Sequence, residues 1–203
     1  AIITGINAVN MADGIHGLAG GNSLVTFFAI LFLAIGNTSY QDLWILLLFC
    51  AVLPVFLIHN LCIGLPKSKR IFMGDAGSMF IGLSLAWVLL DFSQGESRSF
   101  SPVIALWFFA LPLLELSTSI LRRLFSGASP FKPDRFHTHH LMLKLGFSER
   151  LTLMIMLIFS IIMAVIGVLG ELYVLAEYLM FIGFILVFLI YFVFRRLALK
   201  KVN

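Results

Sequence analysis

The 203-residue chain is dominated by apolar residues and carries few charges. Hydrophobic residues make up 61% of it and charged residues 12%, and the mean hydropathy is +1.05. This composition excludes an ordinary soluble domain or a disordered chain and is typical of an integral membrane protein. The net charge of +4 gives no reason to expect a nucleic-acid partner, because no basic stretch is interleaved with aromatic residues that could stack on bases.

Apolar runs long enough to cross a bilayer recur along the chain. A spanning helix needs about 20 mostly apolar residues, with about 17 as a lower bound. We therefore predict an all-α fold, a polytopic bundle of transmembrane helices that forms one integral-membrane domain over residues 1–203. Six complete spans are expected, preceded by the end of another at 1–9, and they cover 22–37, 43–63, 76–92, 102–121, 151–169 and 177–194. Residue 1 is an alanine inside an apparent span and no signal peptide is visible, so the chain is expected to be the C-terminal portion of a longer protein.

The basic residues predict the orientation of these spans. When the spans are followed in order, the segments 10–21, 64–75, 122–150 and 195–203 share one side of the membrane. They contain thirteen of the fourteen Lys and Arg residues, and Arg98 is the exception. Because loops rich in Lys and Arg remain in the cytoplasm, these segments are expected to be cytoplasmic.

The first polar segment, residues 10–14, follows the end of the first apolar run. Asn10 and Asp13 are three positions apart, which places them on one face if the helix continues through them. Both could then reach one ion or one polar substrate. The alternative is an ordinary helix exit, for which Asn, Asp and Gly are common residues.

The second polar segment, residues 72–78, precedes the apolar helix expected from residue 76. Asp75 lies between Gly74 and Gly77 and follows a basic patch at 67–70. A carboxylate here could hold a hard divalent cation, since magnesium prefers oxygen ligands and phosphates. The alternative is that Asp75 only caps the helix. Two further polar segments on the same side favour the ligand.

The third polar segment is the histidine motif, residues 137–140, at the end of a basic loop. His137, His139 and His140 follow Lys132 and Arg135. If 136–146 is a short surface helix, His137, His140 and Lys144 share a face and His139 points elsewhere. Imidazole and guanidinium groups at the membrane surface could bind a diphosphate or help to hold a metal. The alternative is an interfacial helix with exposed histidines.

One carboxylate is predicted inside a span. Glu115 lies in the apolar run 102–121, so it must pair, become protonated or face a polar cavity. Pro112, three residues earlier, predicts a kink there.

Taken together, the motifs NAVNMADGIHGLAGG, FMGDAGS and SPFKPDRFHTHH resemble, in this order, the polyprenyl-phosphate N-acetylhexosamine-1-phosphate transferase family. The likeness is closest to the bacterial undecaprenyl-phosphate GlcNAc-1-phosphate transferases and covers essentially the whole chain. It implies transfer of a sugar 1-phosphate, here GlcNAc 1-phosphate, from a UDP-sugar to undecaprenyl phosphate with release of UMP. That reaction initiates cell-envelope polysaccharide or O-antigen synthesis.

The same resemblance implies a location and cofactors. The protein is expected in the bacterial cytoplasmic (inner) membrane with its active-site loops in the cytoplasm, using Mg²⁺ or Mn²⁺; a homodimer is one allowed assembly. Asp75 matches the principal metal-binding aspartate of the family. Asn10 and Asp13 match its NxxD element near the metal and the nucleotide. The family's paired-aspartate motif has no counterpart in these residues, so full activity is expected of the longer protein and not of the 203 residues alone.

The remaining matches concern the substrate. Phe72 matches the aromatic residue that stacks on uracil, and His16 stands where the family usually has an aspartate linked to uracil binding. His137, His139 and His140 match the HxHH element beside the diphosphate, where Lys132 and Arg135 are also expected to bind. The HxHH form favours a GlcNAc-type donor over the muramyl-pentapeptide donor of MraY-type enzymes, which remain the alternative.

Two functions from other classes stay open. A transporter could also use an intramembrane carboxylate and broken helices, although the polar segments gather at one side and not at the midplane. A membrane scaffold could keep the fold without the chemistry.

Overall fold

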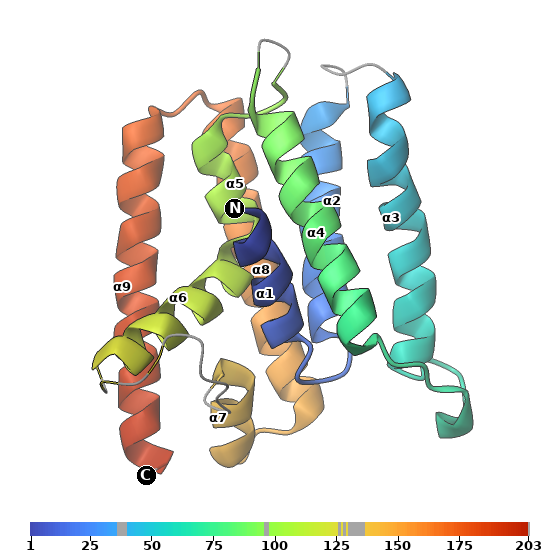
Figure 1. Ribbon diagram of the computed structural model, residues 1–203, viewed down its shortest axis with the longest axis vertical. Coiled ribbons are helices and arrows are strands. Elements are labelled where there is room, and N and C mark those ends of the chain that lie inside the picture. The colour runs from blue at the N-terminus through green and yellow to red at the C-terminus, as the bar shows by residue number, and fades with distance from the viewer. Residues whose placement is uncertain (36–39, 96–97, 126, 128, 130–136, 203) are drawn as a thin grey trace.

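The computed structural model describes residues 1–35, 40–95, 98–125, 127, 129 and 137–202, and all regular secondary structure in these residues is helical. In chain order the elements are α1 (Ile2–Ala12), α2 (Leu18–Ala34), α3 (Tyr40–Asn60), the 3-10 turn η1 (Lys67–Lys69), α4 (Gly74–Ser93), α5 (Pro102–Phe108), α6 (Ala110–Phe125), α7 (Thr138–Lys144), α8 (Glu149–Leu172) and α9 (Glu177–Val202). The helices stand side by side, with α3 and α9 at opposite edges and α6 crossing obliquely (Figure 1).

The helix lengths confirm a polytopic membrane bundle. Four helices in the described part of the chain, α3, α4, α8 and α9, are long and apolar enough to cross a bilayer. Helix α2 has 17 residues, at the lower limit for a span, and α1 has 11. Large apolar side chains such as Trp44 and Ile190, each 70% exposed, cover the outside of the bundle as a lipid-facing surface would require.

The span predicted at 102–121 is instead two helices. α5 and α6 meet at Phe109 with a bend of 84°, about one turn before Pro112. Because proline has no N–H, the carbonyl of Phe108 lacks its usual helical donor. The hydroxyl of Thr26 in α2 donates to that carbonyl at 2.8 Å. A side chain of α2 therefore replaces the missing donor at the break between α5 and α6. Beyond this break, α6 crosses the bundle.

Small residues bring α1 and α4 into close contact. A Cβ added to Gly82 would lie 2.8 Å from the carbonyl oxygen of Gly5, and one added to Gly5 would lie 2.7 Å from the Cβ of Ala86. Close approach through small residues is the usual way in which membrane helices associate. It also fixes the end of α1 beside the start of α4, where the first two polar segments lie.

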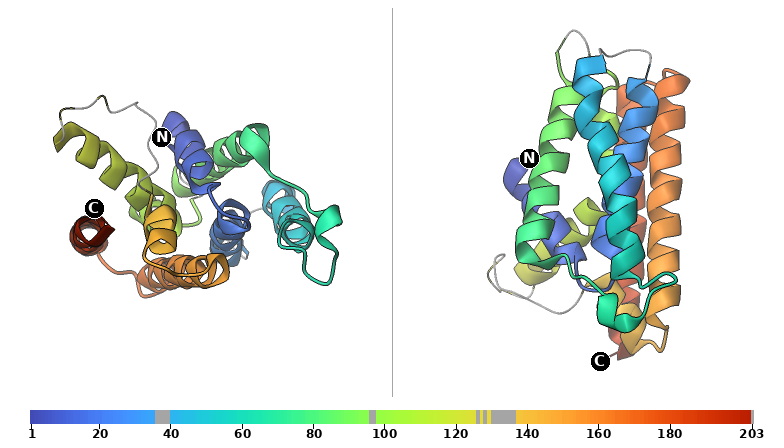
Figure 2. Two further views of the ribbon diagram at one scale, coloured as in Figure 1. Left: turned by 90° about the horizontal axis from the view of Figure 1, so that it is seen from below. Right: turned by 90° about the vertical axis from the view of Figure 1, so that its right-hand side faces the viewer.

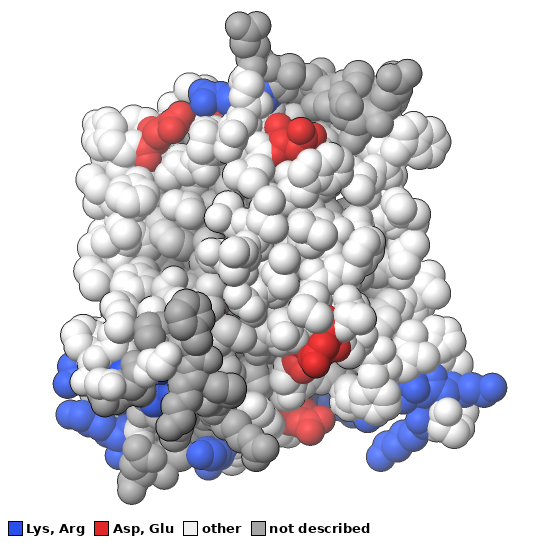
Figure 3. Space-filling model, in the orientation of Figure 1, with Lys and Arg blue, Asp and Glu red and all other residues white. Residues whose placement is uncertain are grey.

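The basic residues of the bundle lie mostly at one of its two ends. The C-terminal ends of α1 and α9, the start of α4, and α7 all lie at the lower end in Figure 1. Most Lys and Arg side chains on the face shown in Figure 3 gather at this same end. At the other end, Arg98 lies 3.6 Å from Glu177 in an exposed ion pair. Of the thirteen basic residues assigned to one side by sequence, the eleven that the structure describes belong to segments at one end of the bundle, and Lys132 and Arg135 lie outside the described residues.

Candidate active site

Residues 10–14 and 72–78 meet where α1 packs on α4. The hydroxyl of Ser78 donates to Oδ1 of Asn10 at 3.0 Å and lies 3.1 Å from the carbonyl oxygen of Asp75. Asp13 ends α1 as its C-cap residue, and Asp75 is in the first turn of α4. Gly74 has φ +66, a conformation that glycine adopts without strain, at the point where the chain turns into α4.

The two carboxylates of this junction act on one another. Partial burial raises the pKa of Asp13 to about 6, and the negative charge of Asp75 contributes to the rise. A carboxylate pair whose charges repel is suited to a divalent cation, because the cation removes the repulsion.

The side chains at this junction offer the oxygen ligands that a hard cation prefers, but they are too few to complete its coordination shell. Among the described residues, no three His, Cys, Asp or Glu side chains converge as a metal site would require. Asn10, Asp13 and Asp75 are all oxygen donors, and magnesium usually takes one or two carboxylates and fills its shell with water and phosphate oxygens. The residues present therefore suit Mg²⁺ better than zinc. The prediction that Asn10 and Asp75 hold the metal stays a prediction.

His16 and Phe72 lie together beside the carboxylates. Their ring centroids are 5.3 Å apart and the rings are tilted by 57°. Both line a cavity of about 230 Å³, together with Asp13, Gly14, Ile15, Asn60, Met73, Gly74 and Glu149. Phe72 is 71% exposed, so its ring is open to a ligand in the cavity.

Asn60 joins the loops that carry these two rings. Its Oδ1 accepts from the backbone N–H of Gly17 at 2.7 Å, and its Nδ2 donates to the carbonyl of Ile71 at 2.8 Å. The side chain is almost fully buried. The side-chain amide of Asn60 thus holds both Gly17, which follows His16, and Ile71, which precedes Phe72.

All three histidines of the motif gather in one cluster. His137 and His139 stack with centroids 5.7 Å apart, and His139 and His140 lie 4.2 Å apart. The expectation that His139 would point away from His137 is therefore wrong. His137 precedes α7 in an extended conformation, so helical spacing does not apply to it.

His139 connects this cluster to residues 10–14. It is 1% exposed, and its ring lies so close to Gly14 that any side-chain carbon there would overlap Nε2. Figure 2, left, shows α7 beside the α1–α2 connection at this end of the bundle. Burial, together with the positive charge on neighbouring groups, lowers the pKa of His139 to about 4, so the imidazole is neutral. Its buried Nε2 has no hydrogen-bond partner among the described residues.

A second apolar cluster holds α7 in this position. Met142 of α7 packs with Ile15, Leu18, Leu111 and Met156, which come from the α1–α2 loop, α2, α6 and α8. The packing is separate from the main core of the bundle. It explains how a helix of seven residues has a fixed place beside the site.

Glu115 is buried and fully engaged, as its place in an apolar segment requires. It accepts from the N–H of Thr138, at 3.2 Å to each carboxylate oxygen, and from the hydroxyl of Tyr191. Nδ1 of His137 lies 3.4 Å away. Arg195 of α9 donates to the carbonyl of Glu115 at 3.3 Å. Glu115 therefore secures the start of the histidine motif from α6, with support from α9.

Lys132 and Arg135, predicted to bind the diphosphate, lie outside the described residues. Every other predicted site residue lies at the basic end of the bundle. Asn10, Asp13, His16, Phe72, Asp75 and His139 belong to one continuous region, and His137 and His140 adjoin it through His139.

Residues 1–93 match the model of a family described as glycosyl transferase family 4. This match assigns residues 1–93 to glycosyl transferase family 4. It is similar to curated proteins named undecaprenyl-phosphate alpha-N-acetylglucosaminyl 1-phosphate transferase. The protein from Escherichia coli O157:H7 is 42% identical over 94% of this chain and 52% of its own length. The one from Pasteurella multocida is 45% identical over 80% and 47%, and the one from Salmonella typhi 42% identical over 81% and 44%.

The chain thus spans about half the length of the curated relatives that it matches. The described site residues lie on α1, α4, α7 and the adjoining loops, and those of α1 and α4 fall within the residues that the family model matches.

Sequence reasoning missed residues that position the site without belonging to a motif. These are Ser78, Tyr191 and Arg195, whose partners lie 68, 76 and 76–80 positions away in the chain. Ser78 is the last residue of the motif FMGDAGS, and a hydroxyl at the start of the predicted helix was a usable signal. Tyr191 and Arg195 gave none, because a tyrosine and an arginine near the end of a span are ordinary interfacial residues.

Proposed function

We propose that the protein containing this chain transfers N-acetylhexosamine 1-phosphate, specifically GlcNAc 1-phosphate, from a UDP-sugar to undecaprenyl phosphate and releases UMP. The observation that carries the proposal is the convergence of three polar segments, residues 10–16, 72–78 and 137–140, at one end of a membrane bundle. The names of the relatives support the acceptor and the sugar. Because the chain covers half of those relatives, the activity is proposed for the longer protein.

The arrangement suggests how the donor would lie. The exposed ring of Phe72 offers a face for the uracil, and His16, 5.3 Å away, offers a hydrogen-bonding edge. The cavity that they line continues to Asp13, so the diphosphate would lie toward the carboxylate pair. His139, packed on Gly14, faces the same region from the other side.

In the reaction, an oxygen of the lipid phosphate attacks the β-phosphorus of the UDP-sugar. A new P–O bond forms, the bond from the β-phosphorus to the bridging oxygen breaks, and that oxygen leaves with UMP. The acceptor is already an anion, so catalysis rests on positioning the two substrates and reducing their repulsion.

The chain's own residues supply distinct parts of this task. Asp13 and Asp75, with Asn10, would hold Mg²⁺ or Mn²⁺, which neutralises phosphate charge when bound. Neutral His139 would donate a hydrogen bond to a phosphate oxygen and not add a cation. His140 is next to it, and Glu115 keeps His137 and Thr138 in place.

We also propose that the basic end of the bundle faces the cytoplasm of a bacterial inner membrane. The support is the placement of eleven of the fourteen Lys and Arg residues in described segments at that end. In a variant without Cys50 and Cys62, a cysteine at Ser68 should resist an impermeant thiol reagent in intact cells, and one at Gln94 should react. Labelling at Ser68 from outside would contradict the orientation.

The activity is tested with the full-length protein reconstituted with undecaprenyl phosphate and magnesium. UDP-GlcNAc should yield equal amounts of UMP and lipid-linked GlcNAc diphosphate, and UDP-muramyl-pentapeptide should yield neither. UMP release without a lipid product would indicate a hydrolase. Absence of both products, in a preparation that binds UDP-GlcNAc, would contradict transfer and favour a scaffold or transporter.

A further inference from the structure

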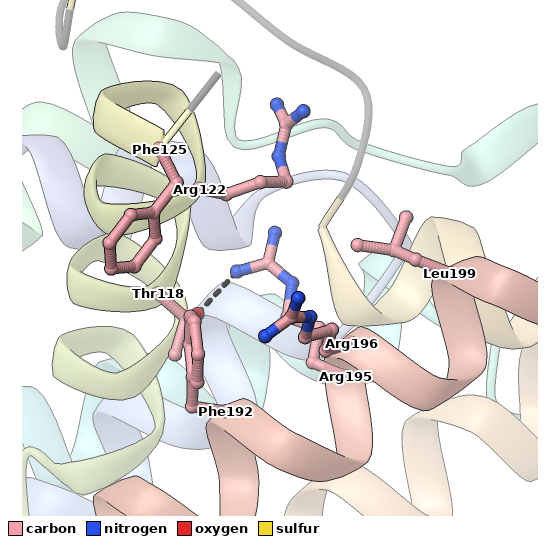
Figure 4. Close-up of a pocket in the computed structure, with 7 residues that line it drawn as sticks. All are labelled: Thr118, Arg122, Phe125, Phe192, Arg195, Arg196 and Leu199. Atoms are coloured by element: carbon pink, nitrogen blue, oxygen red, sulfur yellow. Dashed lines mark hydrogen bonds between the residues drawn. The ribbon is translucent and has the colours of Figure 1, made fainter. Parts of the chain in front are cut away.

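A second cavity lies between α6 and α9, at the same end of the bundle but away from the candidate active site. Its volume is about 320 Å³, and it is lined by Thr118, Arg122, Phe125, Phe192, Arg195, Arg196 and Leu199 (Figure 4). None of the predicted site residues contributes to this lining. It therefore calls for a separate explanation.

Its lining is cationic on one side and apolar on the other. Arginines from both helices gather around the cavity, one from α6 and two from α9. Phe125 and Phe192, with ring centroids 6.2 Å apart, form an apolar wall, and Leu199 lines the cavity on the other side of the arginines (Figure 4). The described lining residues include no carboxylate. Such a lining suits a ligand that joins a phosphate to a hydrocarbon chain.

One of the arginines is held in place. Arg195 is 2% exposed, and its guanidinium donates to the hydroxyl of Ser119 at 2.9 Å and to that of Thr118. Figure 4 shows the bond to Thr118 beside the cavity. A fixed, buried guanidinium recognises phosphate with little loss of side-chain freedom.

The cavity lies at the depth of lipid headgroups. Arg195 is 18 residues beyond Glu177, the first residue of α9. At about 1.5 Å per residue this is about 27 Å along the helix, close to the ~30 Å of a bilayer's hydrocarbon core. Phe125 is 78% exposed, as expected of a side chain that contacts lipid. Basic cavities between membrane helices at the cytoplasmic side are known binding places for anionic lipids.

We propose that this cavity binds the headgroup of an anionic bilayer phospholipid such as phosphatidylglycerol. Arg122 and Arg196 lie beside the phosphodiester, the buried guanidinium of Arg195 adds its positive charge from within the protein, and an acyl chain follows Phe125 and Phe192. A zwitterionic lipid is disfavoured because its own cation would meet three guanidinium groups, and free phosphate would leave the apolar wall without a partner. The proposal does not depend on the transferase activity.

A bound lipid would also support the histidine motif. The same guanidinium of Arg195 donates to the carbonyl of Glu115 at 3.3 Å, and Glu115 holds Thr138. Fixing Arg195 from the cavity side would therefore stabilise the contact between α9 and α6 behind the motif.

The test measures lipid binding and thermal stability of the full-length protein, without an activity assay. In phosphatidylcholine nanodiscs, adding about 20 mol% phosphatidylglycerol should raise the unfolding temperature by several degrees. Native mass spectrometry should show phosphatidylglycerol retained on the protein. Arg196→Gln should weaken apparent binding about five- to tenfold and remove most of the thermal shift.

Lys201→Gln is the matched control, because it removes the same charge from the same helix at an exposed residue outside the cavity. It should keep both the retained lipid and the thermal shift. An equal shift in wild type and Arg196→Gln, or equal loss in both variants, would overturn the proposal. A shift given by undecaprenyl phosphate and not by phosphatidylglycerol would assign the cavity to the acceptor lipid instead, and would also overturn it.

Discussion

The two carboxylate regions at the basic end of the bundle differ in how their charges are satisfied. Asp75 is exposed, and Asp13 is partly buried beside it with a raised pKa. Glu115 is 3% exposed and has a backbone N–H, a tyrosine hydroxyl and a histidine nitrogen around it. The carboxylates of the first region are suited to a bound cation, whereas the carboxylate of the second has its partners within the protein. The first is therefore expected to determine turnover and the second to determine stability and geometry.

The largest effect expected is from Asp75→Asn. The change keeps the size of the side chain and removes the charge that a hard cation needs, so turnover should fall by about 100-fold or more while the protein folds. UMP release by the purified full-length protein across a magnesium titration measures it. Asp91→Asn is the control, since Asp91 is an exposed carboxylate near the other end of α4. Near wild-type turnover for Asp75→Asn would refute its role at the metal.

The next largest effect is expected from Glu115→Ala. The substitution leaves the N–H of Thr138 and the hydroxyl of Tyr191 without their acceptor, which should cost about 3 kcal/mol of unfolding free energy. Thermal unfolding in detergent should show a fall of several degrees. Glu177→Ala removes an exposed carboxylate paired with Arg98 and should cost about 0.5 kcal/mol or less. Equal losses in the two variants would contradict the distinction between the buried and exposed regions.

A smaller effect on turnover is expected from Gly14→Ala. The added methyl group would overlap the ring of His139, which must then move away from the carboxylate pair. We expect turnover to fall about tenfold, because the displaced group serves catalysis, and the unfolding temperature to fall as well, because the buried ring of His139 has to move. The control is Gly183→Ala in α9, whose methyl group would lie 3.3 Å from the side chain of Trp107 in α5. A wild-type rate for Gly14→Ala would show that the position of His139 does not matter.

The smallest effect concerns pH. The folded-state pKa of Asp13 is raised from 3.8 to about 6, so protons compete with the cation below that value. The magnesium concentration for half-maximal turnover should rise several-fold as pH falls from about 7.5 to about 5.5. In metal-free protein, the free energy of unfolding depends on pH in the opposite direction. The contribution of Asp13 to it declines as pH rises from about 4 to 6, because its carboxyl is harder to ionise in the folded protein than in the unfolded chain. Asp13→Asn should remove both dependences, and a magnesium requirement independent of pH would contradict the assignment.

Much of the site follows from sequence because its residues cluster in short motifs. Asp13, Asp75 and the histidines could be named since charged groups in an apolar chain have few structural uses. Residues that hold the motifs in place were not recognisable. Asn60 resembles a helix end, and Tyr191 and Arg195 resemble interfacial anchors, until their partners 43 to 80 positions away are known.

The sequence by itself determined the all-α membrane class, the basic side of the bundle and the polar segments proposed to carry the chemistry, because hydropathy and charge act along the chain locally. Pro112 predicted a kink in the span 102–121, and the tertiary structure decided its place at Phe109, the gathering of all three histidines and the contact of His139 with Gly14. These features depend on which helices pack together. Gly5 and Gly82 let α1 approach α4, and Thr26 satisfies the carbonyl that Pro112 leaves open. Such contacts join residues far apart in sequence, so no local pattern reports them.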